Sequence, residues 1–180
     1  GATEAISPDA PRPGAPLTKR KIITSGNIRF EVSDLPGAEQ QVRELMLSHG
    51  GFLDEERKAE GKRQTNNYWT VRIPSDTTEA FVRALEKQFA PLDRKNISSR
   101  DITEEFIDVE ARLQTRKALE QRFLELLDRA DEINEMIRLE RELSEVRGEI
   151  ESMEQRVKML DNRSSYSTIQ LEFYVEKTPA

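Results

Sequence analysis

His49 is the only histidine among the 180 residues, so it is the one imidazole that could act as a base or a metal ligand. It directly precedes Gly50 at the predicted C-terminal end of a helix. A partly positive imidazole interacts favourably with the helix dipole at such a position. No nucleophile motif accompanies His49 in the sequence. We therefore expect His49 to have a structural role.

Acidic residues, which could bind a metal or act as general acids, gather in two short segments. Residues 54–56 lie on a predicted strand, where successive side chains point to opposite faces and cannot converge. The second segment lacks the spacing of a calcium-binding loop; its acidic residues are Asp101, Glu104, Glu105 and Asp108. No glycine-rich phosphate loop, nucleophile elbow or metal-binding helix motif is present. The sequence therefore predicts no catalytic, cofactor-binding or metal-binding residues, and we expect a protein that is not an enzyme.

The amino-acid composition limits the kinds of protein and of binding partner that are possible. Charged residues make up 34% of the chain and hydrophobic residues 36%, as expected if a long solvated helical segment accompanies a small core. The net charge of −6 argues against a nucleic-acid partner, because binding to phosphates needs a basic surface. The absence of cysteine excludes disulfides and thiolate chemistry. No apolar run approaches the roughly 20 residues that a bilayer-spanning helix needs.

Residues 1–20 are predicted to form a disordered linker rich in proline and alanine. Such a segment cannot bury enough apolar surface to become ordered. It suits a tether between an anchor and a folded domain, although a disordered terminus without a role fits it equally. Because the chain begins with Gly1 rather than methionine, we expect a signal or anchor segment to have been removed.

The first half of the chain alternates between strand and helix patterns. Apolar residues recur at every second position in the predicted strands and on one face of the predicted helices. Asp34 is a predicted N-cap, and two pairs, Asp76 with Glu79 and Asp101 with Glu104, have the spacing of a capping box. The predicted elements are strands at 28–32, 52–58, 69–73 and 92–99 and helices at 34–49 and 76–89. Their order, βαββαβ, is that of a ferredoxin-like sheet domain.

A heptad repeat dominates the second half. Its apolar residues are separated by alternating intervals of three and four, which places them on one seam of a helix. They are Met136, Leu139, Leu143, Val146, Ile150, Met153, Val157 and Leu160. A preceding helix, predicted at 102–128, carries a matching seam with Phe106, Val109, Leu113, Phe123 and Leu127. The break between the two helices is short, which predicts an antiparallel hairpin.

Two charged residues, Arg116 and Glu120, occupy seam positions that should be apolar. Polar residues at such positions often fix the register of paired helices. Folding the hairpin about Ala130 places them opposite the segment around Glu140 and Ser144. We hypothesise that Arg116 and Glu120 pair with each other or with Glu140 and so align the hairpin. The alternative is that both side chains extend to water along a wider seam.

Residues 166–176 alternate again between apolar and polar, so a final strand should return to the sheet. The sequence thus predicts an α+β fold: a ferredoxin-like βαββαβ sheet domain with a long antiparallel helical hairpin, a coiled coil, inserted before a final strand. The predicted boundaries are 1–20 for the linker, 21–100 for the first part of the sheet domain, 101–163 for the hairpin and 164–177 for the final strand.

Several of these segments resemble a known bacterial family, the domain of unknown function 4349. The resemblance covers about Lys21 to Val175, and its most specific parts are FIDVEARL at 106–113, VRGEIE at 146–151 and STIQLEF at 167–173. It implies a lipoprotein-like protein of the cell envelope, with a signal peptide, an extracytoplasmic domain and commonly a transmembrane helix after the last strand. The family carries no established activity, so the resemblance implies no catalytic residues.

We therefore expect a membrane-tethered module on the periplasmic or outer side of the envelope, whose coiled-coil arm makes protein–protein contacts. Its partner would be an unidentified envelope protein or a second copy of the chain, with no nucleic acid, and the membrane would be reached through segments outside this sequence. The alternative is a ligand-sensing extracytoplasmic domain of a membrane-bound regulator.

Overall fold

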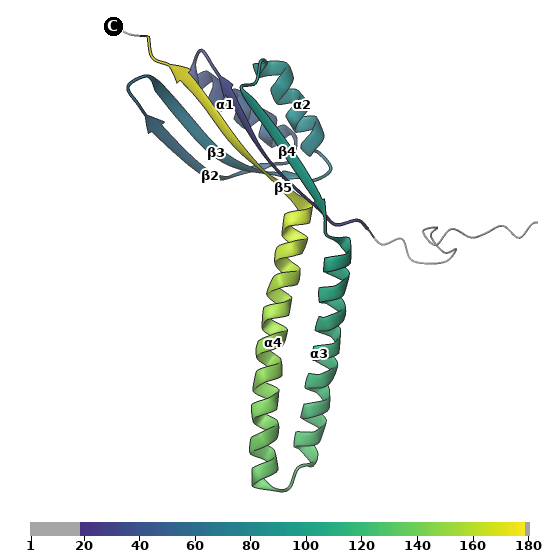
Figure 1. Ribbon diagram of the computed structural model, residues 1–180. Helices are drawn as coiled ribbons and strands as arrows, with labels where there is room; N and C mark the ends of the chain where they lie inside the picture. The colour runs from purple at the N-terminus through teal and green to yellow at the C-terminus, as the bar shows by residue number, and fades with distance from the viewer. Residues whose placement is uncertain (1–18, 179–180) are drawn as a thin grey trace, which may run out of the picture.

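The alternating and helical patterns of the sequence form five strands and four helices in the computed structural model, which describes residues 19–178. All but the last two residues of the predicted linker at 1–20 lie outside the described residues. Figure 1 shows a sheet domain from which two long helices project side by side. The elements are β1 (Ile22–Glu31), α1 (Leu35–Ser48), β2 (Phe52–Glu60), β3 (Gln64–Pro74), α2 (Thr78–Phe89), β4 (Arg94–Asp101), α3 (Thr103–Arg129), α4 (Ile133–Ser165) and β5 (Tyr166–Glu176).

The five strands form one mixed sheet in the order β2-β3-β5-β1-β4. β5 pairs in parallel with β1, with Leu171 opposite Ile28, and antiparallel with β3, with Leu171 opposite Trp69. The two outer pairs, β1 with β4 and β2 with β3, are antiparallel. The final strand therefore returns to the sheet as predicted, and the α+β class is confirmed.

The strand order differs from the predicted ferredoxin-like sheet. In that arrangement β1 and β3 are direct neighbours, whereas here β5 lies between them and pairs with both. The physical reason is the composition of β5. Its inward residues Ile169, Leu171 and Phe173 are all fully buried, and only a central position in the sheet lets one strand bury so continuous an apolar row.

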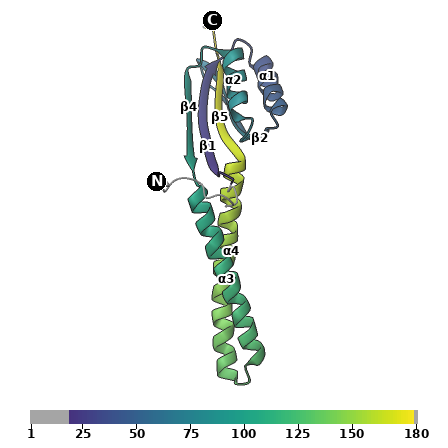
Figure 2. The same ribbon diagram turned by 90° about the vertical axis from the view of Figure 1, so that its right-hand side faces the viewer.

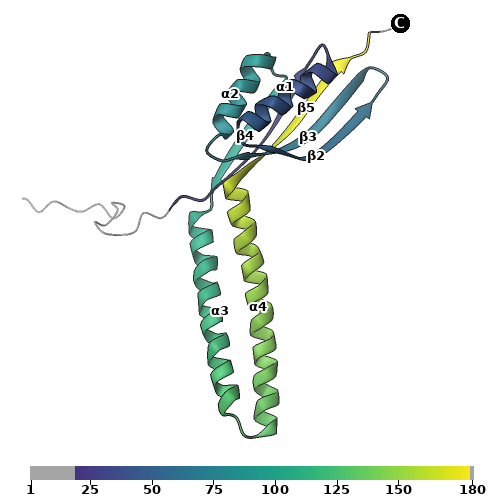
Figure 3. The ribbon, with the colours of Figure 1, turned by 180° about the vertical axis from the view of Figure 1, so that it is seen from behind.

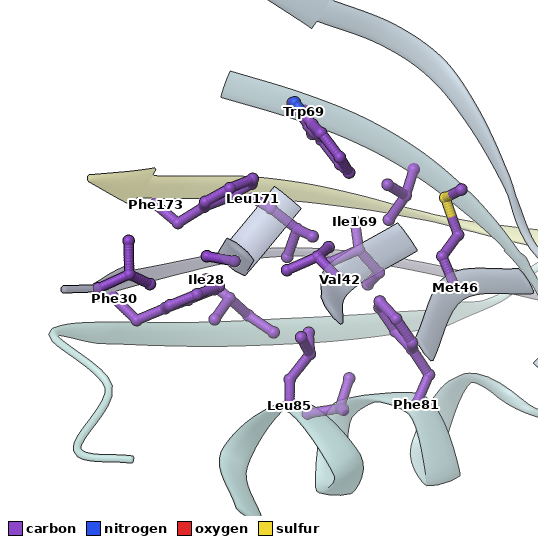
Figure 4. Packing of buried hydrophobic residues seen from close by; sticks show 14 of the residues in the cluster. Ile28, Phe30, Val42, Met46, Trp69, Phe81, Leu85, Ile169, Leu171 and Phe173 are labelled. Carbon is purple, nitrogen blue, oxygen red and sulfur yellow. The ribbon is translucent and has the colours of Figure 1, made fainter. Parts of the chain in front are cut away.

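The hydrophobic core lies between the sheet and one layer formed by α1 and α2. Figures 2 and 3 show both helices on the same face, which leaves the opposite face without a helix. Aromatic rings fill the core near β5, where Phe173 stacks on Phe30 at 5.5 Å between ring centroids and meets Trp69 edge-on at 5.1 Å. Val42 and Phe81 close the core from the helices (Figure 4). Trp69 points into the core, with 3% of its surface exposed.

The helix ends depart from the predicted capping boxes. Asp34 is the N-cap of α1 as predicted, although its side chain makes no capping hydrogen bond. The N-caps of α2 and α3 are Thr77 and Ile102, one residue after the predicted Asp76 and Asp101. Asp76 is therefore not the N-cap of α2, whereas the side chain of Asp101 still caps the first turn of α3, because its Oδ1 accepts a hydrogen bond from the backbone N–H of Thr103 at 2.9 Å. Gly50 ends α1, since its φ of 75° lies in the left-handed region that favours glycine.

Two strands are longer than predicted. β1 begins at Ile22 rather than at 28, because the polar residues between these positions pair with β4 and β5 even though they show no apolar alternation. β3 begins at Gln64, where pairing with β2 and β5 continues past the predicted strand. Backbone hydrogen bonds to the neighbouring strands on both sides therefore extend β1 and β3 beyond the residues that alternate between apolar and polar.

Candidate functional site: the helical arm

The helices α3 and α4 form an arm that is held together by the predicted seam. None of the predicted seam residues is exposed. The middle of the arm is closed by Leu113, Val146 and Ile150, which pack in one cluster with Phe123 and Met153 at its edge. The helices span Thr103–Arg129 and Ile133–Ser165, so the hairpin begins and ends two residues later than the predicted 101–163, and three residues connect its helices. At 1.5 Å per residue, α3 is about 40 Å long.

The two charged seam residues have partners different from those predicted. Arg116 Nε lies 2.7 Å from Glu149 Oε2, and Arg147 Nε donates to Glu120 Oε2 at 3.1 Å. The predicted pairing with each other or with Glu140 was therefore wrong. Because the connection is centred after Ala130, the residues that face α3 lie further along α4 than a fold about Ala130 would place them.

These contacts belong to a set of ion pairs between the two helices. Arg156 Nη2 pairs with Glu105 at 2.6 Å near the sheet domain, and Lys117 Nζ lies 3.6 Å from Glu154. All the side chains involved are partly exposed, so each pair contributes modestly to stability. Their joint effect is on alignment, because sliding one helix by a turn would break every pair at once.

The arm joins the sheet without a flexible connection. α4 ends at Ser165 and β5 begins at Tyr166, and only Ile102 separates β4 from α3. Ile102 is buried in a small cluster with Val109 and Leu160 that joins the arm to β1. The arm and the central strand of the sheet therefore form one continuous structure.

Polar contacts reinforce this junction. Lys21 Nζ, next to β1, pairs with Asp161 of α4 at 2.8 Å. Arg72 Nη2 on β3 donates to Asn162 Oδ1 at 2.7 Å. Asp101 Oδ1 accepts hydrogen bonds from the hydroxyl and the backbone N–H of Thr103, and these bonds lower the pKa of the Asp101 carboxyl below its ordinary value. Three strands of the sheet are thus tied to the base of the arm.

The distal end of the arm exposes apolar side chains that are not part of the seam. Ile133 is 72% exposed, Ile137 45% and Leu126 38%. Ile133 and Ile137 are four residues apart on α4 and therefore share one face. Leu126 lies in the last turn of α3, across the short connection. Sequence reasoning missed this patch, although the signal was available: these apolar residues fall outside the alternating intervals of the seam.

Charge at the distal end is mainly negative. Residues 125–135 contain a single basic residue, Arg129. Their acidic residues are Glu125, Asp128, Asp131, Glu132 and Glu135. The connection beside Leu126 and Ile133 is therefore acidic, whereas three arginines lie in the adjoining helical turns: Arg122, Arg138 and Arg141. That combination suits a partner with apolar and basic side chains on one face.

The residues whose side chains could act as a base or bind a metal lie apart from this patch. His49 is the C-cap of α1, where its Nδ1 lies 2.7 Å from the carbonyl oxygen of Leu45 and its ring meets Phe81 edge-on. Glu105 is held in its ion pair with Arg156. Within residues 19–178, no three His, Cys, Asp or Glu side chains are grouped so that they could hold a metal ion.

A network of charged and phenolic groups lies on the helix-free face of the sheet. Arg29 donates from Nε to Glu172 at 2.7 Å and from Nη1 to Asp93 at 3.1 Å. Tyr174 also donates its hydroxyl to Asp93, and this hydrogen bond raises the pKa of Tyr174 to about 12. The network fixes β1, β5 and the segment before β4 at the end of the sheet away from the arm.

The fold and the arm together define a class of protein: an α+β sheet domain with a protruding helical hairpin built between its fourth strand and its central fifth strand. The family model described as "Domain of unknown function (DUF4349)" matches residues 20–180, and the chain belongs to this family. The resemblance stated from the sequence is thereby confirmed. No curated protein and no solved structure matches the chain. Between residues 19 and 178, none of the helices has the length and apolar character needed to cross a bilayer.

Proposed function

We propose that the protein is an interaction module that presents the distal end of its helical arm to a partner protein. The single observation that carries this proposal is the exposure of Ile133 and Ile137 on one face of α4 at the far end of the arm. Exposed apolar residues that cluster beside a charged surface are typical of interaction sites. The apolar seam residues of α3 and α4 cover one another, so the distal patch is left exposed to another molecule.

The chemistry of the patch defines the partner. An amphipathic helix could cover Leu126, Ile133 and Ile137 with its apolar face and place lysine or arginine side chains against the acidic residues around them. A second copy of the chain is a poorer fit, because it would bring two acidic connections between α3 and α4 close together.

We further propose that the module acts outside the cytoplasm, tethered to a membrane through segments outside this sequence, and that it has no enzymatic activity. The resemblance stated from the sequence, which implies a lipoprotein-like protein of the cell envelope, supports this location. The sheet domain would then serve as the base of the arm. We regard this base as a ferredoxin-like unit whose β1 and β3 are parted by β5, because the remaining strands keep the order β2-β3-β1-β4.

Ligand sensing is a second candidate function, favoured by the junction. Because α4 continues directly into β5, a ligand that shifts the arm would also shift the central strand of the sheet. In a sensor, that displacement would pass through the sheet domain to a membrane segment. The two functions differ in what happens after binding: a sensor changes the sheet domain, whereas an interaction module does not.

Site-specific crosslinking tests the first proposal. A photoreactive amino acid replaces Ile137 in the protein expressed in its own cells. The same amino acid replaces the exposed Gln155, in the part of α4 nearer the sheet domain, as a control. We expect one dominant adduct from position 137 only, containing a protein with a basic amphipathic helix. Ile133→Lys should abolish that adduct. Equal labelling at both positions, or an adduct insensitive to Ile133→Lys, would refute distal docking, and an adduct of two identical chains would identify self-association instead.

A further inference from the structure

Within the described part of the chain the sheet has two open edges, and they differ in how well they could pair with another strand. At the edge formed by β2, six of the nine residues are charged and the register shifts between Leu53 and Glu55. Charged side chains and bulges of this kind keep other strands from pairing with an edge. β4, the outermost strand on the other side (Figure 2), keeps an unbroken register with β1, and its central residues 96–99 carry no charge. β4 therefore offers a regular row of backbone N–H and C=O groups to one more strand.

A groove of about 990 Å³ lies beside this edge, with α2 on its other side. Side chains of β1 and β4 that point toward the helix layer form its floor, among them Ile22 and Ile97, and Val82 of α2 lies in its wall. The helices leave this floor partly uncovered, because Ile22 is 40% exposed and Ile97 39%. A Cβ at Gly26 would collide with Ile97, so the glycine lets Ile97 lie across β1. An apolar side chain of an added strand can therefore pack on Ile97 and enter the groove.

The groove and the edge carry more positive than negative charge, in a chain whose net charge is −6. Their acidic residues are Asp76, Glu79, Glu86 and Asp101. Their basic residues are Lys19, Arg20, Lys21, Arg83, Arg94, Lys95 and Arg100. Every one of these acidic residues except Asp76 already pairs with a basic residue of the same set. The charge left over is therefore mainly basic, which favours an acidic partner.

Two arginines of β4, Arg94 and Arg100, stand near the two ends of the edge. Neither forms an ion pair with any residue in the range 19–178. Both alternate with Ile97, so their side chains point to the face of the sheet away from the groove. They are six residues apart, which is about 20 Å along a strand. A matching strand would carry acidic residues six positions apart on one face and apolar residues on the other.

We propose that β4 binds an extended acidic segment of another protein, which becomes a sixth strand of the sheet. Main-chain hydrogen bonds supply the affinity in this mode of recognition, and the alternate side chains supply the specificity. Apolar side chains of the segment face the groove over Ile97, and acidic side chains meet Arg94 and Arg100. The site belongs to the sheet domain and shares no residue with the distal end of the arm. This proposal and distal docking can therefore fail independently.

A second copy of the chain and a nucleic acid fit this edge less well. Two β4 strands side by side would bring their basic residues together, and like charges on paired strands are destabilising. Phosphates would be attracted by the arginines but repelled by the acidic residues that line the groove, which are Asp76, Glu79 and Glu86. The row of backbone groups instead favours a peptide strand, because a strand presents donors and acceptors at the same spacing.

Nuclear magnetic resonance titration of the whole chain tests the proposal with the peptide acetyl-Glu-Val-Thr-Val-Thr-Val-Glu-amide. Its pattern reads the same in both directions, so it suits a parallel or an antiparallel strand. The control peptide has lysine in place of both glutamates. At about 2 mM acidic peptide, where even weak binding is visible, we expect shift changes at Ile97, Ser98 and Ser99. The lysine peptide should bind about tenfold more weakly, because two attractions become repulsions.

Two N-methylated forms of the acidic peptide separate strand pairing from other contacts. Successive residues of a strand point their N–H groups to opposite edges, so only one alternate set faces β4. N-methylation of that set should abolish binding, whereas N-methylation of the other set should change the affinity by less than about twofold. Hydrogen exchange at alternate amides of β4 should slow in the complex. Slow exchange at all β4 amides before peptide is added would show that the edge is already occupied, which would overturn the proposal.

Three variants complete the test. Arg100→Glu should weaken binding of the acidic peptide about threefold to tenfold, since one attraction becomes a repulsion. Ile97→Ser should weaken it about tenfold, because the floor of the groove loses its apolar side chain. Arg63→Glu makes the same charge change at an exposed position in the turn between β2 and β3 and should leave the affinity unchanged.

Several results would each overturn the proposal. They are the absence of shift changes in β4, equal binding of the acidic and lysine peptides, equal effects of the two N-methylated peptides, and insensitivity to Ile97→Ser. Binding of oligothymidylate at β4 in place of the peptide would assign the edge to nucleic acid instead. A dimer that forms through β4, detected by light scattering and lost in Arg100→Glu, would assign it to a second copy of the chain.

Discussion

The alignment of the arm can be tested by reversing the ion pair between Arg116 and Glu149. Their closest atoms are 2.7 Å apart, and their side chains are 41% and 37% exposed. Water therefore screens the pair, and its attraction contributes only about 0.2–1 kcal/mol. Glu149→Arg replaces this attraction by a repulsion of similar size. We expect it to lower the free energy of unfolding by about 1 kcal/mol, which for a chain of this size lowers Tm by roughly 2–4 °C.

The assay is urea unfolding followed by circular dichroism, applied to Arg116→Glu, to Glu149→Arg and to the double variant. The double variant restores an attractive pair in the opposite sense, so it should be more stable than the sum of the single effects predicts. Reversal of Arg83 and Glu79 on α2 is the control, because their side chains are 72% and 81% exposed and should show almost no coupling. Additive effects at Arg116 and Glu149 would refute the register described for the arm.

Three further predictions concern single positions. Gly148→Ala should raise the free energy of unfolding by about 0.5–1 kcal/mol in urea titrations, because a Cβ there meets no atom within 4 Å and alanine favours the helix; a destabilised variant would contradict the open environment of this position. Phe173→Ala should destabilise the protein by about 3–5 kcal/mol in the same assay, since it empties the centre of the core; a loss below 1 kcal/mol would contradict its central place. Because the pKa of Tyr174 is raised to about 12, its stabilising effect is complete below its ordinary value of 10.0 and is lost as the pH rises towards 12. Ultraviolet titration should show this late ionisation, and Asp93→Asn should lower the pKa; an unchanged titration would contradict the hydrogen bond.

The elements that local patterns specify could be predicted from the sequence. The heptad from Met136 to Leu160 and the alternation in residues 166–176 are short-range signals, and both elements lie where they were expected. β4 shows why other parts are harder. All eight of its residues are exposed, so it has no apolar alternation, and its place at the sheet edge depends on pairing with β1 alone.

The features that could not be predicted depend on pairing between residues that lie far apart in the sequence. The position of β5 between β1 and β3 depends on pairing between residues about 90 to 140 positions apart, which no local spacing records. The partners of Arg116 and Glu120 depended on where the connection turns, and an error of a few residues moved them along α4.

The central place of β5 has a consequence for how the chain folds. During synthesis, β1 and β3 emerge long before β5, the strand that lies between them. Neither strand can therefore form its hydrogen bonds with β5 early. The 64 intervening residues, 102–165, would make that closure entropically costly as a flexible loop. An antiparallel hairpin forms from local contacts and brings its two ends together. It therefore places Tyr166, the first residue of β5, close to β1 and β3. Mutations that weaken the arm should therefore slow the folding of the sheet, even where the sheet itself is unchanged.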